Sequence, residues 1–422
     1  MAAEAPPPLD TGNTAWLLAS TALVLFMMIP GLALFYAGLV RAKNVLSVLM
    51  QCFALTAVLS LVWLAGGYSL AFAGEGTFIG DLSKAFLNGI RPDSYHGNSQ
   101  GSGVPELVFF AYQMTFFVIT PGLIIGAVVE RMKFTALLLF MTLWSILVYL
   151  PVCYMVWYKG DFFGLTAIKN EAGEVIRAGV IDHAGGIVVH ITAGIAALVA
   201  CIMVGRRSDH GKTPLMPHNL PMTVTGAAML WVGWFGFNAG SGLAANGAAG
   251  MTLIVTHISA CTATLVWMGI EWVLLKRPTV LGAATGSIAG LAAITPAAGS
   301  VGPVGAIIIG TVSATACWYF SVKLKARFKY DDSLDVFGVH GVGGFIGTVL
   351  LGLLAHEKFG GLNNTASLGV QLQAALYTTF YSAAISAALL FAISKTIGLR
   401  VSEQSEREGL DQAEHGENAY NP

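Results

Sequence analysis

The chain has 422 residues, of which 55% are hydrophobic and only 11% are charged, with a formal net charge of −1. Soluble domains carry roughly a quarter charged residues, so a soluble protein of this length could not cover its surface with so few charges. The composition excludes soluble enzymes, secreted disulfide scaffolds and disordered proteins. It indicates an integral membrane protein, as does the mean hydropathy of +0.70.

The uncharged runs of the sequence predict an all-α fold with eleven transmembrane helices. A helix needs roughly 20 apolar residues to cross about 30 Å of hydrocarbon. Single-span runs lie at residues 10–41, 43–75, 106–130, 133–159 and 182–206. Two longer runs, 212–271 and 277–323, each have room for two spans, with breaks near 241–250 and 295–303, where Gly, Asn and Pro cluster. The last two spans are expected at 336–355 and 366–394.

The basic residues predict how these spans are oriented. With the N-terminus outside, 16 of the 22 Lys and Arg residues fall on the inner side, mostly in short loops. Cytoplasmic loops are enriched in Lys and Arg, so we expect a multi-pass protein of the cell (inner or plasma) membrane. Its parts are an extracytoplasmic segment (residues 1–12), an eleven-helix domain (13–397) and a cytoplasmic C-terminal tail (398–422). No basic n-region precedes the first span, so no signal peptide is expected, with a processed start as the alternative.

A short internal repeat predicts that the domain has two halves. FYAGLVRAKN (residues 35–44) and FNAGSGLAAN (237–246) agree at five of ten positions. The first lies at the inner end of span one and the second at the outer end of span six, which is typical of two five-helix halves in inverted topology. We expect the halves at about 13–205 and 219–355, followed by a final helix at about 366–394. A chance match in Gly- and Ala-rich sequence is the alternative.

Small residues are interpreted as packing residues. The five cysteines all lie in apolar stretches and form no C-x-x-C pair, so they imply neither a disulfide nor a metal site. Gly282, Gly286 and Gly290 recur at every fourth position of span eight. Such a stripe predicts that another helix approaches span eight closely.

Two histidines are expected to occupy equivalent places in the two halves. His190 lies in span five and His340 in span ten, each after an aspartate, Asp182 or Asp335, that we expect to cap its helix. Ionisable residues inside a span are functional candidates, so we predict that the pair meets near the middle of the membrane. Structural core histidines, a bis-histidine haem site and a proton relay are the alternatives. His257, in span seven, has no counterpart and is expected to be structural.

The predicted pore contains no Asp, Glu, Lys or Arg beside these histidines. An unpaired cation at the centre of a bilayer costs several kcal/mol or more. A pore lined by apolar side chains and two neutral imidazoles therefore suits a small neutral molecule that forms hydrogen bonds.

Aromatic and hydroxyl side chains are expected together at the outer mouth. By topology, Phe116, Trp157, Asp182, Phe237 and Ser241 all lie toward the outer side. An aromatic face attracts a small cation by about 0.5–2 kcal/mol per contact, which is enough to recruit a cation. A membrane-interface belt is the alternative for Trp157, and a plain helix cap is the alternative for Asp182.

The chain resembles the ammonium transporter (Amt/Mep/Rh) family, and bacterial Amt proteins in particular, over nearly its whole length. The resemblance rests on five stretches: PGLALFYAGLV (30–40), DHAGGIVVHITAG (182–194), PHNLP (217–221), WFGFNAGS (234–241) and DVFGVHGVGG (335–344). It implies an eleven-helix protomer with pseudo-twofold halves, assembled as a homotrimer with one pore per subunit.

The resemblance also implies roles for individual residues. Phe116, Trp157 and Ser241 match the outer site that recruits ammonium, and Phe116 and Phe237 match the stacked gate beneath it. His190 and His340 match the twin histidines of the pore, and Asp182 matches the supporting acidic residue near the outer site. Phe117, next to Phe116, is the alternative for the aromatic position in span three.

The resemblance implies a transporter or channel that binds ammonium (or its analogue methylammonium), deprotonates it and conducts ammonia to the cytoplasm, with or without a proton on a separate path. By composition the tail is a solvated charged segment, whereas the resemblance implies that it couples subunits and responds to a cytoplasmic PII signalling protein. We expect a lipid bilayer around the protein, no metal, cofactor or nucleic acid, and no enzymatic activity, since no nucleophile motif or phosphate loop is present. The alternatives are an ammonium-sensing receptor that uses the same pore and a haem-binding redox protein. About 28 residues follow Ser394, and we expect an output module to need more.

Overall fold

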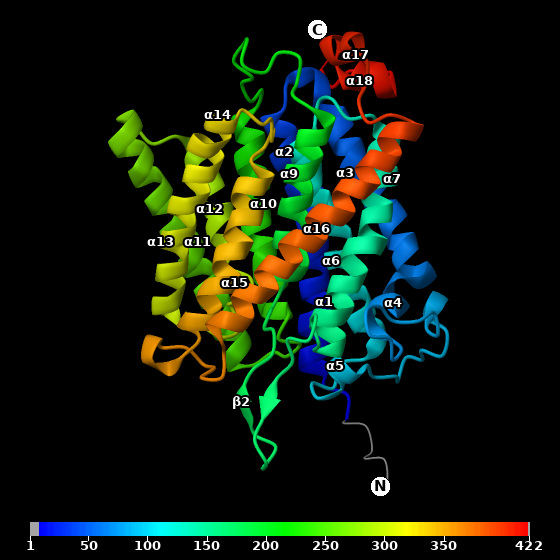
Figure 1. Cartoon of the computed structure of the whole chain (residues 1–422), viewed down its shortest axis with the longest axis vertical. Coiled ribbons are helices and arrows are strands. Elements are labelled where there is room, and N and C mark those ends of the chain that lie inside the picture. Colours follow the sequence, from blue (N-terminus) through cyan, green and yellow to red (C-terminus); the bar gives the residue numbers. More distant parts are fainter. Residues whose placement is uncertain (1–7, 421–422) are drawn as a thin grey trace.

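Long apolar helices make up almost all of the protein (Figure 1). The computed structural model describes residues 8–420; the first seven residues of the predicted 1–12 segment lie outside them. Within the described residues, ten helical segments of 18 to 31 residues are long and apolar enough to cross a membrane. The protein is therefore a multi-pass helical membrane protein.

The first five spans are in part built from helical pieces joined end to end. The first consists of α1 (Thr11–Phe26), η1 (Met27–Leu32) and α2 (Ala33–Leu39). The second consists of η2 (Ala42–Asn44), α3 (Val45–Val62), η3 (Trp63–Gly67) and α4 (Tyr68–Phe72), and the third is α6 (Glu106–Val128). The fourth consists of α7 (Phe134–Trp144), η5 (Ser145–Tyr149), α8 (Leu150–Cys153) and η6 (Tyr154–Lys159), and the fifth of η7 (Gly186–Ile191) and α9 (Thr192–Val204).

The second part of the chain contains five more long spans and one shorter apolar helix. The sixth and seventh spans are α10 (Leu220–Gly240) and α11 (Gly247–Leu275), and the shorter helix α12 (Val280–Ile294) follows. The next span consists of α13 (Pro303–Trp318), η8 (Tyr319–Leu324) and α14 (Lys325–Phe328). The last two are η9 (Phe337–Gly341) with α15 (Val342–Leu354), and α16 (Leu368–Thr396).

The helix α12 is the one place where the expected count of eleven differs from the structure. The breaks in the two long uncharged runs fall where the Gly, Asn and Pro clusters predict them, between α10 and α11 and between α12 and α13. However, α12 has only 15 residues. The chain continues from Thr295 to Val301 as buried turns, and non-helical backbone at membrane depth is tolerated where protein buries it.

The two ends of the bundle carry different short elements (Figure 1). One end, called the hairpin end below, carries the antiparallel pair β1 (Ile168–Lys169) and β2 (Val175–Arg177), with η4 (Ala85–Leu87), α5 (Gly97–Gln100) and η10 (Glu357–Phe359) in the loops. The start of α1 lies at this end. The opposite end, called the tail end, carries α17 (Glu403–Glu408) and α18 (Leu410–His415). The hairpin is the exception to the all-α prediction, and it lies in a loop.

The tail packs onto the start of α3 and onto the loop after α9, and it is not the solvated segment that its composition predicts. The Asp411 carboxylate accepts a hydrogen bond from the Ser47 N–H (2.8 Å) at the start of α3. The Glu406 carboxylate accepts one from the Ser208 N–H (2.6 Å), and both acids are buried. Each carboxylate thus satisfies a backbone donor that has no helical partner.

Glycines allow the helices that carry the two pore histidines to touch. A Cβ atom on Gly194 of α9 would lie 2.2 Å from the Gly341 nitrogen, and one on Gly344 of α15 would lie 2.7 Å from the His190 Cβ. The Gly stripe of α12 has the predicted packing role as well: a Cβ on Gly286 would lie 2.7 Å from the Trp267 Cβ of α11. Close helix approach at small residues is typical of membrane proteins.

We predict that Gly194→Ala lowers the stability of the bundle, because its methyl group would force α9 away from η9. Overpacking of this kind costs about 1–3 kcal/mol. The measurement is the midpoint of thermal unfolding of the detergent-purified protein. Gly269→Ala in α11 is the matched control, since nothing lies within 4 Å of its Cβ position, and we expect an unchanged or higher midpoint. Equal midpoints for Gly194→Ala and the wild type would contradict the packing argument.

Candidate functional site

His190 and His340 lie in direct contact in the interior of the bundle. Their Nδ1 atoms are 3.3 Å apart, and the rings stack with centroids 5.2 Å apart and an interplanar angle of 22°. Both side chains are buried, with 1% and 4% exposure. The structure therefore brings together the two histidines that the sequence places 150 residues apart.

The shared hydrogen bond restricts the charge of the pair. A hydrogen bond between two Nδ1 atoms needs one N–H and one lone pair, whereas an imidazolium has N–H groups at both nitrogens. The two rings cannot both be protonated while they share this bond. The Nε2 atom of His190 is buried and has no hydrogen-bond partner among the described residues, so it is available to a small molecule beside it.

A small chamber lies beside the histidine pair. Its lining combines the two imidazoles with Trp234, Phe237 and aliphatic side chains, and it leaves about 10 Å³ for the centre of a water-sized molecule. The Trp234 ring stacks on His190 at 5.5 Å, and its indole N–H donates to the Thr295 hydroxyl (2.9 Å). A volume of this size holds about one water-sized molecule.

The rings of Phe116 and Phe237 form a tilted stack on the hairpin side of this chamber, with 40° between their planes. Their ring centroids are 4.4 Å apart, and Phe237 lies 6.1 Å from the His190 ring. Both are 1% exposed. The structure also decides between Phe116 and its neighbour: Phe117 packs against Trp63 and Tyr149 and does not take part in this stack.

Trp157 and Ser241 lie near the stack and are partly exposed. The Trp157 ring meets Phe116 edge to face at 5.8 Å, and its indole N–H donates to the Asp182 carbonyl (2.8 Å). The Ser241 hydroxyl donates to the Phe237 carbonyl (2.8 Å) and lies 3.2 Å from the Tyr112 hydroxyl. Tyr112 thus supports Ser241, a role that sequence reasoning did not assign.

Asp182 is a helix cap. Its carboxylate accepts four backbone hydrogen bonds of 2.6–3.0 Å from Gly185, Gly186, Ile187 and Val188, at the start of the segment that carries His190. These bonds occupy both carboxylate oxygens of a side chain that is 7% exposed. The carboxylate faces the backbone of η7.

In the second half of the chain the cap is Asp332, and the expectation that Asp335 caps that helix is wrong. The Asp332 carboxylate accepts hydrogen bonds from the N–H groups of Val336 (3.1 Å) and Phe337 (2.8 Å). Asp335 has a positive φ of 60° and forms an ion pair with Lys325. The usable signal was the spacing, since Asp332 precedes His340 by eight residues, as Asp182 precedes His190.

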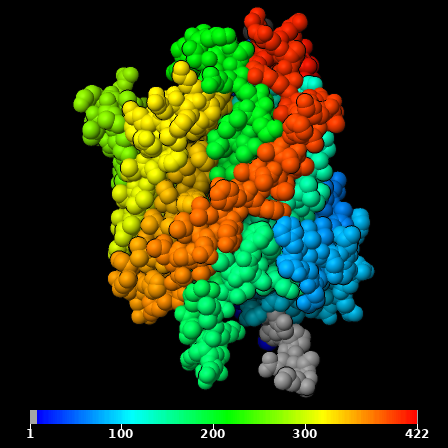
Figure 2. All heavy atoms as spheres, in the orientation of Figure 1, coloured from blue at the N-terminus to red at the C-terminus, as the bar shows by residue number. Residues whose placement is uncertain are grey.

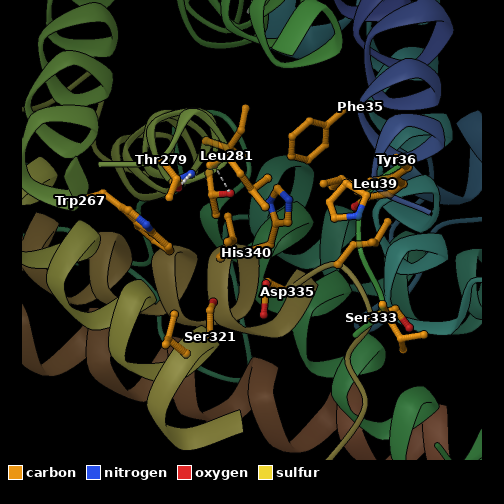
Figure 3. Close-up of a pocket in the computed structure, with 18 of the residues that line it drawn as sticks. Phe35, Tyr36, Leu39, Trp267, Thr279, Leu281, Ser321, Ser333, Asp335 and His340 are labelled. Atoms are coloured by element: carbon orange, nitrogen blue, oxygen red, sulfur yellow. Dashed lines mark hydrogen bonds between the residues drawn. The ribbon is translucent and has the colours of Figure 1, made fainter. Parts of the chain in front are cut away.

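A larger cavity of about 250 Å³ opens at the tail side of His340 (Figure 3). His340, Phe35 and Ile288 line both this cavity and the small chamber, so they lie between the two. Tyr36, Glu271, Ser321 and Asp335 also line the larger cavity. Among the described residues, charged side chains therefore line the larger cavity, and the lining of the small chamber contains no Asp, Glu, Lys or Arg.

His257 and the cysteines lie away from this arrangement. His257 is exposed on α11, beside Trp231 and Phe235. Four of the cysteines are buried and Cys261 is partly exposed.

Together the fold and the cavities define a class: a multi-pass helical membrane protein with a narrow apolar chamber in its interior. Residues 15–420 match the Ammonium Transporter Family. The chain belongs to this family.

Individual relatives and solved structures agree with this assignment. The chain is 46% identical to the "Ammonium transporter" of Aquifex aeolicus, covering 98% of this chain and 94% of that protein. It is 41% identical to the "Ammonium transporter" of Bacillus subtilis, covering 98% and 99%. The crystal structure of Candida albicans Mep2 superposes with a TM-score of 0.84 at 31% identity, covering 98% and 91%. A structure described as a sensor Amt protein superposes with a TM-score of 0.83 at 27% identity, covering 96% and 98%.

We predict that Asp182→Ala and Asp332→Ala each lower the midpoint of thermal unfolding, because the backbone N–H groups at a buried helix start lose their acceptor. Loss of a cap costs about 0.5–2 kcal/mol, and burial places these two at the upper end of that range. Asp10→Ala is the matched control, since Asp10 caps α1 with one hydrogen bond to the Asn13 N–H in an exposed position. A larger loss for Asp10→Ala than for the two buried caps would contradict this interpretation.

Proposed function

We propose that the protein transports ammonium, recruiting the cation at the hairpin end, deprotonating it and conducting ammonia past His190 and His340. The observation that carries the proposal is the buried imidazole pair, with Nδ1 atoms 3.3 Å apart, in a chamber whose other lining is almost wholly apolar. The names of the relatives as ammonium transporters support it and favour transport over an enzymatic role.

Recruitment would use the site formed by Phe116, Trp157 and Ser241. Trp157 and Ser241 are partly exposed, whereas Phe116 is buried and would block the path from these two residues to the histidine pair. Each aromatic face contributes about 0.5–2 kcal/mol to binding of a small cation. This attraction concentrates ammonium at the mouth but does not offset the cost of carrying a charge through hydrocarbon.

The next step is loss of the proton at the gate formed by Phe116 and Phe237. The rings are 4.4 Å apart, so passage requires them to move. Beyond them the chamber holds about one water-sized molecule. An ammonium ion there would lose most of its hydration without gaining a carboxylate, whereas ammonia keeps the hydrogen bonds that two imidazoles offer.

The histidine pair is suited to a molecule that both donates and accepts hydrogen bonds. One ring has its proton on Nδ1 and therefore a lone pair on Nε2, and the other ring has the reverse arrangement. Ammonia can donate to the first Nε2 and accept from the second. A metal cation such as potassium could bind only the single free Nε2 lone pair of the pair, and no negatively charged side chain lines the described chamber to neutralise it. The pair would therefore select against potassium.

The same proposal includes the finer architecture. We propose that α12 completes an eleven-span bundle and that two five-helix halves have inverted topology. The eight-residue Asp–His spacing in both halves supports the repeat. So do Asn44 and Asn246, the last residues of the repeated segment, each of which directly precedes a helix, α3 or α11. The hairpin end would be extracytoplasmic and the tail end cytoplasmic, in the inner or plasma membrane.

We further propose a homotrimer with one pore per subunit and regulation by a PII protein at the tail end. The described part of the tail (398–420) contacts two separate segments, because Asp411 binds a backbone N–H at the start of α3 and Glu406 binds one in the loop after α9. Displacing the tail would release both contacts.

An ammonium-sensing receptor is the second candidate function, and the similarity to the sensor Amt structure favours it. The two functions differ in flux. A sensor binds ammonium at the same outer site with little passage, whereas a transporter carries many molecules per minute. Labelled methylammonium uptake into proteoliposomes separates them.

We expect the double variant His190→Ala/His340→Ala to lose at least about tenfold in ammonium-evoked current or uptake, because the chamber loses its hydrogen-bonding groups. A single hydrogen-bonded partner is worth about 1 kcal/mol, and the chamber would lose two. The measurement is current on solid-supported membranes beside labelled uptake, whose ratio reports whether a proton accompanies each ammonia. His257→Ala, on the surface of α11, is the control and should match the wild type. Full uptake by the double variant, or equal wild-type currents for potassium and ammonium, would overturn the mechanism.

We expect Trp157→Leu to weaken the apparent affinity for ammonium by about 2- to 30-fold, which corresponds to one cation–π contact of about 0.5–2 kcal/mol. The maximal transport rate should change less than the affinity. Trp157 lies on the solvent side of the Phe116–Phe237 gate and would affect binding more than passage through the gate. Trp272→Leu is the control, since Trp272 lies 61% exposed on α11. An unchanged half-saturating concentration for Trp157→Leu would remove Trp157 from the recruitment site.

A further inference from the structure

The loop between α4 and α6 reaches Trp157 through the side chain of Asn98. The Asn98 amide donates a hydrogen bond to the Trp157 carbonyl oxygen (2.8 Å). Asn98 belongs to the short helix α5 (Gly97–Gln100) at the hairpin end, where the light-blue surface in Figure 2 contains this loop. Trp157 lies in the last turn of η6 (Tyr154–Lys159), and carbonyl groups in the last turn of a helix lack a helical partner. Asn98 therefore supplies a donor that the helix itself does not provide.

Trp157 is thereby held at two points. Its indole N–H donates to the Asp182 carbonyl, and its own carbonyl accepts from Asn98, each at 2.8 Å. Directly after η6 the chain turns at Gly160, whose φ is +66°. The bond from Asn98 thus fixes the turn of helix from which the Trp157 ring extends to meet Phe116 at 5.8 Å.

A buried histidine in turn holds Asn98. The Nδ1 atom of His96 accepts a hydrogen bond from the Asn98 N–H (3.1 Å), and its Nε2 atom lies 2.8 Å from the Phe72 carbonyl oxygen. The ring stacks on Phe109 at 4.8 Å with an interplanar angle of 6°, and His96 is 3% exposed. Because a carbonyl oxygen can only accept, both bonds require the neutral ring with its proton on Nε2. An imidazolium would direct a second N–H at the Asn98 N–H and lose that bond.

The charged groups around His96 already compensate one another. Lys84 forms an ion pair with the Glu106 carboxylate, which also accepts from the Tyr68 hydroxyl (2.7 Å). The rings of Tyr68 and Tyr158 lie 6.2 and 5.6 Å from the imidazole. Within the described part of the chain, no unpaired carboxylate faces the imidazole to stabilise its charged form. Burial is the main cause that lowers the pKa of His96 from its ordinary value of 6.5.

We propose that Asn98 is a positioning residue for ammonium recruitment, and that neutral His96 holds it in place, so that acid at the hairpin end weakens the affinity for ammonium. This inference rests on the proposed recruitment role of Trp157. Because the pKa of His96 is lower in the anchored loop than in an open one, anchoring is complete above the ordinary pKa of 6.5 and is lost progressively as the pH falls below it.

The first test compares Asn98→Ala with Asn88→Ala in proteoliposomes. The control removes a similar bond in the same loop, since the Asn88 amide donates to the Ser83 carbonyl (3.0 Å), away from Trp157. We expect Asn98→Ala to raise the half-saturating methylammonium concentration about two- to fivefold, the equivalent of up to one hydrogen bond, with little change in maximal rate. In a Trp157→Leu background, Asn98→Ala should have no further effect on affinity. A merely structural role would instead add to the loss.

The second test is the pH profile, with the same pH on both sides of the membrane. From about pH 7.5 to about pH 5.5 ammonium stays charged, whereas a histidine titrates, and the wild type should lose affinity. His96→Asn keeps an acceptor for the Asn98 N–H that cannot be protonated, so its affinity should not change with pH. Hydrogen–deuterium exchange of the peptide that contains Asn98, corrected for the intrinsic effect of pH, should rise in acid for the wild type and not for His96→Asn. This second measurement does not depend on transport.

The outcomes separate this inference from the proposed function. Unchanged affinity in Asn98→Ala beside weakened affinity in Trp157→Leu would overturn the positioning role and leave the recruitment site intact. Unchanged affinity in both variants would remove the recruitment site, and the inference with it. The role of His96 would be overturned by wild-type exchange that does not rise in acid, or by an equal acid response in His96→Asn.

Discussion

The backbone donors at two buried helix starts impose the constraint on which the rest of this structure depends. In the interior of a membrane protein, the N–H groups at the beginning of a helix have little water to bind. The start of η7 is buried, and at the start of η9 Asp332 and Val336 are buried while Phe337 is partly exposed. Asp182 and Asp332 satisfy them by placing a carboxylate over each start. A negative charge at a helix N-terminus is favourable in itself. Because each aspartate is fixed to the backbone eight residues before a histidine, the caps set where both histidines lie.

Close contact between the backbones of the two histidine-bearing segments brings His190 and His340 together. Gly194 and Gly341 lie where α9 meets η9, and Gly344 lies against His190. Larger side chains at these points would hold the helices apart, and the 3.3 Å contact between the Nδ1 atoms would be lost. These three of the 50 glycines in the chain are therefore required for the contact between the two histidines as well as for helix packing.

The low charge content has two effects. It allows the bundle to lie in hydrocarbon, and the described lining of the chamber contains no carboxylate that would neutralise a cation. Charge is concentrated instead at the two ends. At the tail end, carboxylates of the tail bind backbone N–H groups at the start of α3 and in the loop after α9.

The sequence by itself determined the membrane class and ten of the spans with their approximate limits. It also singled out the two histidines and the Phe116 and Phe237 rings that the structure places close together. These features can be read from local composition and from the length of apolar sequence that one membrane-spanning helix requires. Tertiary structure alone decided that α12 is too short to count as a long span, that Asp332 and not Asp335 caps η9, and that Phe116 and not Phe117 stacks on Phe237. It also decided that the charged tail packs on the start of α3, that Tyr112 contacts Ser241, and that Trp234 stacks on His190. The capping, stacking and tail contacts all join segments that lie far apart in the chain. They are decided by packing between helices and loops, which the sequence around any one of these residues does not determine.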